Sequence, residues 1–239
     1  MTLEDKKIKI PTRPSEDDFS FNAQQVDFKN KRIRQKPGNA LGMYIGDYPD
    51  NYSEFETDGT LEFNGDATVW DDLRVPVTST KPGNTSPDFG SFVGGGLKTW
   101  LFNGAGLAEE VHFTVQLPHG YKIGTDIVPH VHWTPTTNLD TTNVKWGLEY
   151  NWADIDGTFG ASTTIYAIDA CEGTAWEHLR VDFAAIDGSG ITGISSMLVC
   201  RLFRNSADGD DTYEQDAALL EIDFHYEIDT IGSRKILTK

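Results

Sequence analysis

Alternating apolar and polar residues predict β-strands along most of the chain after residue 60. In Val111–Leu117 the odd positions are apolar and the even positions are polar. In Leu220–Ile228 the even positions are apolar. The opposite face of this second segment carries Glu221, Asp223, His225 and Glu227. A period of two residues is typical of strands with one buried face, so we expect the polar row to be solvated.

Similar runs recur from residue 61 to residue 228. They are Leu61–Phe63 with Ala67–Trp70, Val111–Leu117, Ile127–Trp133, Val144–Trp152, Ser162–Ile168, Trp176–Phe183, Ser196–Phe203 and Ala218–Ile228. Turn signals such as Asp156-Gly157 separate them. Helical periodicity is absent from every stretch of ten or more residues, and Gly104–Glu110 is expected to form one or two helical turns at most. About eight antiparallel strands favour an all-β fold, a jelly roll or a related β-sandwich.

Three segments do not have this strand pattern. Residues 1–37 contain three prolines and no periodic stretch, so we expect an extended arm that orders against a partner. Residues 38–60 are rich in Gly, Tyr and Asp and are expected to form a loop-rich connector. We therefore divide the chain into an arm with its connector, 1–59, and a jelly-roll body, 60–239. Within the body, 79–98 is expected to be a long loop with a functional or interface role.

The arm and the rest of the chain carry opposite net charges. The 239 residues have a formal net charge of −17. Residues 1–37 contain nine Lys and Arg against six Asp and Glu, which gives +3 and leaves −20 for residues 38–239. Because phosphate binding needs clustered positive charge, we expect no nucleic-acid partner. No apolar run approaches the roughly 20 residues of a membrane span, so we expect no membrane partner.

The arm combines mixed charges with three phenylalanines, which is typical of docking onto a protein. The expected attachment residues are Lys6, Lys7, Lys9, Arg13, Phe19, Phe21, Phe28, Lys31, Arg32 and Arg34. The two cysteines, Cys171 and Cys200, lie in or beside apolar runs and are expected to be buried and reduced. Since no signal peptide is recognisable at the start of the sequence, we expect synthesis in the cytoplasm.

The sharpest candidate for chemistry is His130-Val131-His132. Two His at i and i+2 on a strand point to one face, as a metal site on a β-barrel requires. Gly124 stands six residues before His130, a spacing that resembles the first half of the cupin motif. The Glu that should follow is replaced by Thr136 and Thr137. His130 and His132 are therefore either metal ligands or two stacked His on a strand face.

Other candidate sites are weaker. His225 with Asp223 and Glu227 is a second possible ligand row. Acidic turns at Asp208, Asp210 and Asp211, and at Asp154 and Asp156, could bind Ca²⁺ or simply be surface loops. Sugars could stack on Trp133, Trp146, Trp152 and Trp176, although alternating Trp are more often core residues. The sequence has no nucleophile motif and no phosphate-binding Gly loop, so we expect neither an enzyme nor a cofactor.

Several strings resemble a group of jelly-roll structural proteins of tailed bacteriophages and prophages. The strings are Gly65–Leu73, Asp126–Trp133, Trp146–Tyr150 and Leu220–Tyr226. The resemblance covers roughly 60–235. It implies a multimeric virion protein, expected to be a homotrimer, that is made in the host cytoplasm and serves as a capsid decoration, head fibre, spike or tail-associated subunit. In that setting the His-x-His pair is structural.

The sequence therefore predicts a virion structural protein whose arm docks onto the major capsid protein or another virion protein. Its body is expected to trimerise through an apolar sheet face. Two other functions remain open. One is a receptor- or carbohydrate-binding tail module that contacts a host surface glycan through exposed Trp and the 79–98 loop. The other is a cupin-like metal-binding protein that uses His130 and His132.

Overall fold

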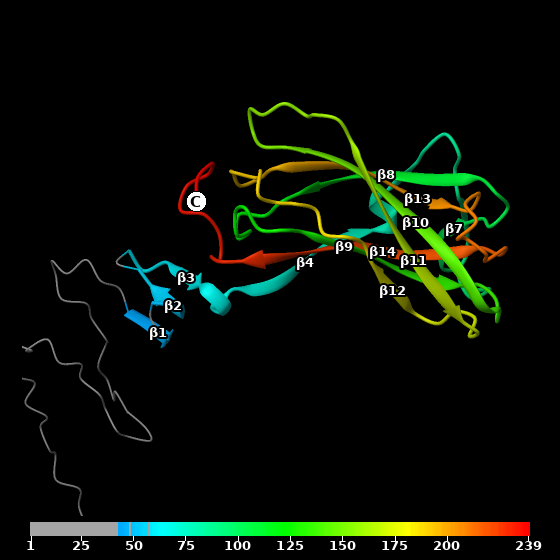
Figure 1. Ribbon diagram of the computed structural model, residues 1–239, viewed down its shortest axis with the longest axis horizontal. Helices are drawn as coiled ribbons and strands as arrows, with labels where there is room; N and C mark the ends of the chain where they lie inside the picture. Colours follow the sequence, from blue (N-terminus) through cyan, green and yellow to red (C-terminus); the bar gives the residue numbers. More distant parts are fainter. Residues whose placement is uncertain (1–42, 48, 57) are drawn as a thin grey trace, which may run out of the picture. The chain divides into compact units, whose positions relative to one another are not determined.

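The computed structural model describes residues 43–47, 49–56 and 58–239, which fold into an all-β structure (Figure 1). These residues belong to one compact unit, Ala40–Lys239. The expected arm and all of its attachment residues lie outside the described part of the chain. Among the residues described, the helical elements are two single 3-10 turns, η1 (Gly65–Ala67) and η2 (Val77–Ser79).

The body consists of two antiparallel sheets. One has the order β11-β10-β13-β8-β5. Its strands are β11 (Thr163–Glu172), β10 (Asp140–Ala153), β13 (Met197–Asn205), β8 (Ala108–Gln116) and β5 (Lys81–Pro82). The other has the order β12-β9-β14-β7-β6, and β4 also pairs with β14. Its strands are β12 (Leu179–Asp182), β9 (Val128–Pro135), β14 (Ala217–Ile228), β7 (Lys98–Phe102), β6 (Asp88–Ser91) and β4 (Val69–Pro76).

The strand pairing identifies the body as a jelly roll. From β7 to β14 the chain pairs first with last, inwards: β7 with β14, β8 with β13, β9 with β12, and β10 with β11. These pairs alternate between the two sheets. A long antiparallel hairpin rolled into two facing sheets is the jelly-roll arrangement of eight strands. The predicted fold class is confirmed by this strand order alone.

The core lies between the sheets and follows the predicted alternation. Val111, Phe113 and Val115 of β8 are buried, as are Ile222 and Phe224 of β14. Two tryptophans fill the centre: Trp133 and Trp146 have no solvent exposure, and their ring centroids lie 6.3 Å apart. They are core residues, so neither can stack on a sugar. Cys171 and Cys200 are buried free thiols, as expected, and burial raises the pKa of Cys200 to about 12.

The structure corrects two local predictions. The expected loop 79–98 contributes edge strands to both sheets, because β5 pairs with β8 and β6 pairs with β7. The expected connector 38–60 contains β1 (Met43–Asp47) and β2 (Asn51–Phe55), which pair around a tight turn at Pro49-Asp50. In both cases pairing with a neighbouring strand supplies hydrogen bonds that the local sequence pattern does not reveal. Gly104–Glu110 contains no helical turn, within the expected limit of one or two, and its last three residues begin β8.

Candidate functional site: a histidine–carboxylate cluster

Histidines and carboxylates gather on the outer face of the β12-β9-β14-β4 sheet. Val131 and Trp133 of β9 point into the core, so the alternation directs His130 and His132 outwards. The register places His130 opposite Asp223 of β14. It also places His225 of β14 opposite Asp72 of β4. The cluster is thus built by the pairing of three strands.

Three ligand-type atoms converge within this cluster. Nε2 of His130 and Nε2 of His132 are 3.1 Å apart. Oδ2 of Asp223 lies 3.4 Å from the first nitrogen and 3.1 Å from the second. A second group shares His130 and adds His225 and Asp72. There Nε2 of His225 lies 2.6 Å from Oδ1 of Asp72, and the rings of His130 and His225 are 4.3 Å apart.

The first group is largely shielded from water. The side chains of His130 and Asp223 are 2% and 6% exposed, and that of His132 is 22% exposed. Burial lowers the pKa of His132, an effect that the charge of Asp223 partly opposes. This shift favours the neutral form of His132. Among the residues that the structure describes, Nδ1 of His130 and Oδ1 of Asp223 have no hydrogen-bond partner. These buried, unpaired atoms distinguish the cluster from an ordinary polar strand face.

The sequence identified part of this cluster. His130 and His132 were predicted to share a face, and the structure brings them together. The expectation that the polar face of Leu220–Ile228 is solvated is wrong for Asp223, because β14 lies between two strands whose side chains cover it. Glu227 lies apart from the cluster and contacts Lys122 and Thr68. Asp72 and His178 were missed, since only the strand register and the loop before β12 bring them close.

The acidic turns considered for Ca²⁺ have other partners. Asp208 and Asp210 each lie 2.9 Å from Nζ of Lys145. Asp211 pairs with the buried guanidinium of Arg204. Asp154 accepts hydrogen bonds from Thr192 and Ser196. The two metal-type clusters among the described residues contain none of these carboxylates. Their roles are in loop anchoring.

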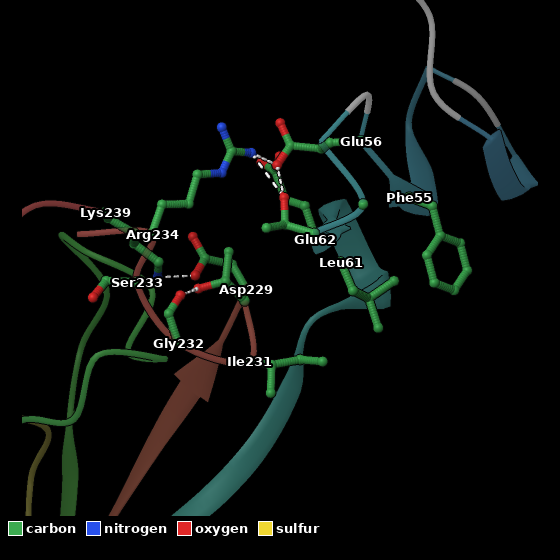
Figure 2. Close-up of a pocket in the computed structure, with 13 residues that line it drawn as sticks. Phe55, Glu56, Leu61, Glu62, Asp229, Ile231, Gly232, Ser233, Arg234 and Lys239 are labelled. Carbon is green, nitrogen blue, oxygen red and sulfur yellow. Dashed lines mark hydrogen bonds and ion pairs between the residues drawn. The ribbon is translucent and has the colours of Figure 1, made fainter. Parts of the chain in front are cut away.

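Two cavities lie elsewhere on the described surface. The larger, of about 640 Å³, lies where the chain after β14 passes the turn between β2 and β3 (Leu61–Asn64) (Figure 2). Its cations are already paired: Arg234 contacts Glu56 and Asp58, and Lys239 contacts Asp229. Apolar side chains, among them Phe55 and Leu61, complete the lining. This arrangement fixes the carboxyl-terminal segment to the small β1-β2-β3 sheet.

The second cavity, of about 590 Å³, lies at the end of β10. It is lined by two aromatic side chains, Tyr150 and Trp152, together with polar groups that include Asn151, Asp154 and Asp187. Trp152 is half-buried and packs partly against the core. Of the four tryptophans considered for sugar stacking, Trp152 is the one that lines a cavity; Trp176 instead makes an edge contact with Phe92.

The outer face of the β11-β10-β13-β8-β5 sheet carries exposed apolar residues. We call Tyr166, Ile168, Val199 and Phe203 the outer apolar face, in which Phe203 is itself buried. The first three are 46–50% exposed. Phe203 packs over Gly147, where a Cβ atom would lie 2.2 Å from the ring. It also makes an edge contact with Tyr166 and supports the guanidinium of Arg201.

Comparisons with known proteins add little to this description. The sequence matches no family in a scan of protein families, and a search of curated proteins also gave no match. Solved structures that are similar in part include the following three. One is a xylanase 10B fragment of Clostridium thermocellum with CBM22-1 and GH10 modules, complexed with xylohexaose. It is 12% identical to this chain, with a TM-score of 0.36, and the match covers 70% of this chain and 30% of that one.

The other two similar structures are a viral protein and a sugar-binding module. A chain of infectious bursal disease virus Gx strain is 12% identical, with a TM-score of 0.35 over 79% of this chain and 38% of that one. The mannan-recognising module TmCBM27 is 13% identical, with a TM-score of 0.27 over 66% and 88%. This chain thus spans less than two fifths of the first two structures. At these TM-scores none of the three informs the function of this protein. In the described ranges no helix has the length and hydrophobicity of a membrane span.

Proposed function

We propose that this protein is a structural subunit of a tailed-bacteriophage virion, a multimeric capsid decoration, head fibre, spike or tail-associated protein without catalytic activity. One observation carries the proposal. The strings that resemble phage jelly-roll proteins imply a jelly roll, and the strand order of the body is that of a jelly roll. Three of these strings form β4, β9 and β14, which are adjacent in one sheet. The resemblance therefore falls on paired framework strands.

The proposed subunit has two working parts. Residues 1–37, with a charge of +3, attach the protein to the major capsid protein or to another virion protein. The body associates with two copies of itself through the outer apolar face and so forms a homotrimer. Such contacts remove apolar surface from water. The negative charge of the remaining residues keeps crowded copies soluble.

Light scattering on the purified chain, with and without residues 1–37, tests this division. The deletion removes none of the buried hydrophobic residues that the structure describes, which begin at Val75. We expect the mass of a trimer for both forms. A monomer that associates only when 1–37 are present would move self-association into the arm. Monomers in both cases would contradict a multimeric subunit.

A glycan-binding role is the second candidate, because Tyr150 and Trp152 line the cavity at the end of β10. Aromatic rings beside carboxylates and amides are suited to a sugar's apolar face and hydroxyl groups. The test is glycan-array binding of the full chain. If the cavity binds sugar, Trp152→Ala abolishes the signal, whereas Trp70→Ala, an exposed Trp on β4, retains it. Absence of binding by the unaltered chain eliminates this role.

A further inference from the structure

We propose that His130, His132 and Asp223 form a binding site for a divalent transition-metal ion, with Zn²⁺ as the ion it fits. Two imidazole nitrogens and one carboxylate oxygen are a ligand set that zinc accepts, with its remaining position open to water or another ligand. This inference is independent of the proposed virion role, because it rests only on the cluster between β9 and β14.

The distances match zinc coordination. With zinc–ligand distances of about 2.0–2.1 Å, two ligands of a tetrahedral ion are separated by about 3.3 Å. The three separations here are 3.1, 3.1 and 3.4 Å. The three atoms therefore occupy three corners of a tetrahedron of the right size. These separations allow one ion to contact all three atoms.

Hydrogen bonding alone satisfies these atoms poorly. If both Nε2 atoms carry protons, two N–H groups lie 3.1 Å apart and compete for one carboxylate oxygen. If either histidine carries its proton on Nδ1 instead, its Nε2 lone pair faces the carboxylate oxygen of Asp223 at 3.1–3.4 Å. Two acceptors at this distance repel each other, and a cation between them removes the repulsion. A cation at the centre uses both Nε2 lone pairs directly, and the unpartnered Oδ1 of Asp223 can serve as a second carboxylate ligand.

The charge on Asp223 also needs a cation. Among the described residues, its ion-pair partners are His130 and His132. The nearby guanidinium groups are engaged elsewhere: Arg74 lies 2.6 Å from Glu221, and Arg180 lies 2.9 Å from Asp182. A buried carboxylate is stable only when paired or bound to a metal. A divalent ion held between the two imidazoles and this carboxylate would supply the positive charge at the distances observed.

The surroundings orient one ligand. Nδ1 of His132 lies 2.7 Å from Nε2 of His178, a hydrogen bond that fixes the ring of His132 with Nε2 towards Asp223. Such outer contacts normally accompany metal-binding histidines. The partial exposure of His132 gives the ion a route from solvent. A bound ion would join the neighbouring strands β9 and β14 and so stabilise the fold.

Isothermal titration of the untagged, chelator-treated full chain with ZnCl₂ tests the site. We expect one Zn²⁺ per chain and a rise in melting temperature on binding. Asp223→Asn and His132→Gln should each weaken binding at least 100-fold, because each removes one of three ligands. Binding of Co²⁺ should give the visible absorption of a tetrahedral ion. His112→Gln, at an exposed position of β8, is the matched control and should bind as the unaltered chain does.

Three results would overturn the assignment. The first is that the full chain binds no Zn²⁺, and the second is that Asp223→Asn and His132→Gln leave the binding unchanged. The third is that His225→Gln abolishes binding while His132→Gln retains it, which would place the ion beside Asp72. Circular dichroism checks that each variant is folded. His132 is partly exposed, so His132→Gln provides a test even if Asp223→Asn does not fold.

Discussion

Arg204 and Asp211 form a two-point ion pair that solvent does not reach. Nε and Nη2 of Arg204 donate to the two carboxylate oxygens at 3.0 and 2.7 Å, and the side chains are 0% and 1% exposed. The same guanidinium donates to the backbone carbonyl oxygens of Phe102 and Gln215. It thereby ties β13 to β7 and to the loop that precedes β14. The turn that contains Asp211 was considered as a possible calcium-binding loop, and in the structure it anchors the jelly roll.

Removal of this carboxylate should strongly destabilise the protein. Asp211→Ala leaves a buried guanidinium without its counter-charge, so we expect a loss of about 3–5 kcal/mol in the free energy of unfolding. Urea denaturation measures it. The control is Asp210→Ala, because Asp210 pairs with Lys145 at a largely exposed position, and exposed pairs contribute about 1 kcal/mol or less. Equal losses of unfolding free energy in the two variants would show that the ion pair between Arg204 and Asp211 does not contribute specially to stability.

Charges on the outer apolar face should break self-association. Tyr166→Lys combined with Ile168→Lys places two charges where the proposed trimer contact excludes water. We therefore expect the affinity of self-association to fall at least tenfold. Sedimentation velocity over a concentration series measures the change. Trp70→Lys, at an exposed position of the other sheet, should leave the trimer intact. An unchanged trimer in the double variant would exclude this face as the contact.

Glu227 should contribute stability that is lost in acid. A hydrogen bond from Lys122 lowers the pKa of Glu227 from its ordinary value of 4.5; burial opposes the shift and a bond from Thr68 supports it. Because the pKa is lower in the folded state, the contribution is present above pH 4.5 and disappears as pH falls through the folded-state pKa. Glu227→Gln should therefore cost up to about 1 kcal/mol at pH 7 and nothing in strong acid.

Chemical denaturation at a series of pH values checks this prediction. The difference between Glu227→Gln and the unaltered chain should shrink steadily below pH 4.5. Glu214→Gln, at an exposed position outside the strands, is the control and should track the unaltered chain. A Glu227→Gln difference that stays constant down to strong acid would mean that its effect is not electrostatic.

The sequence predicted the strands whose alternation is long enough to be unambiguous. β8, β9 and β14 follow their period-two patterns, and each contributes buried residues to the core. β7 was missed because it is five residues long and places a polar residue, Thr99, in a buried position, where it donates to the carbonyl of Leu219. β7 is held by its partners β14 and β6 on either side, and no local pattern records such pairing.

The cluster shows the same limit. Spacing placed His130 and His132 on one face, but alternation assigns a side chain to a face without saying whether neighbours cover that face. Asp223 is buried because β14 runs between β9 and β4. Asp72 precedes His225 by more than 150 residues, and only the register of β4 on β14 brings them together. Such a site needs the pairing of distant strands before it can be recognised.

Incorporation into virus particles tests the central claim most directly. Particles purified by density gradient from the native host culture would be probed with an antibody against this chain, beside a culture whose copy lacks residues 1–37. We predict that the full chain sediments with the particles at a fixed ratio to the major capsid protein, and that the shortened chain stays in the soluble fraction. Absence of the full chain from purified particles would contradict a virion role.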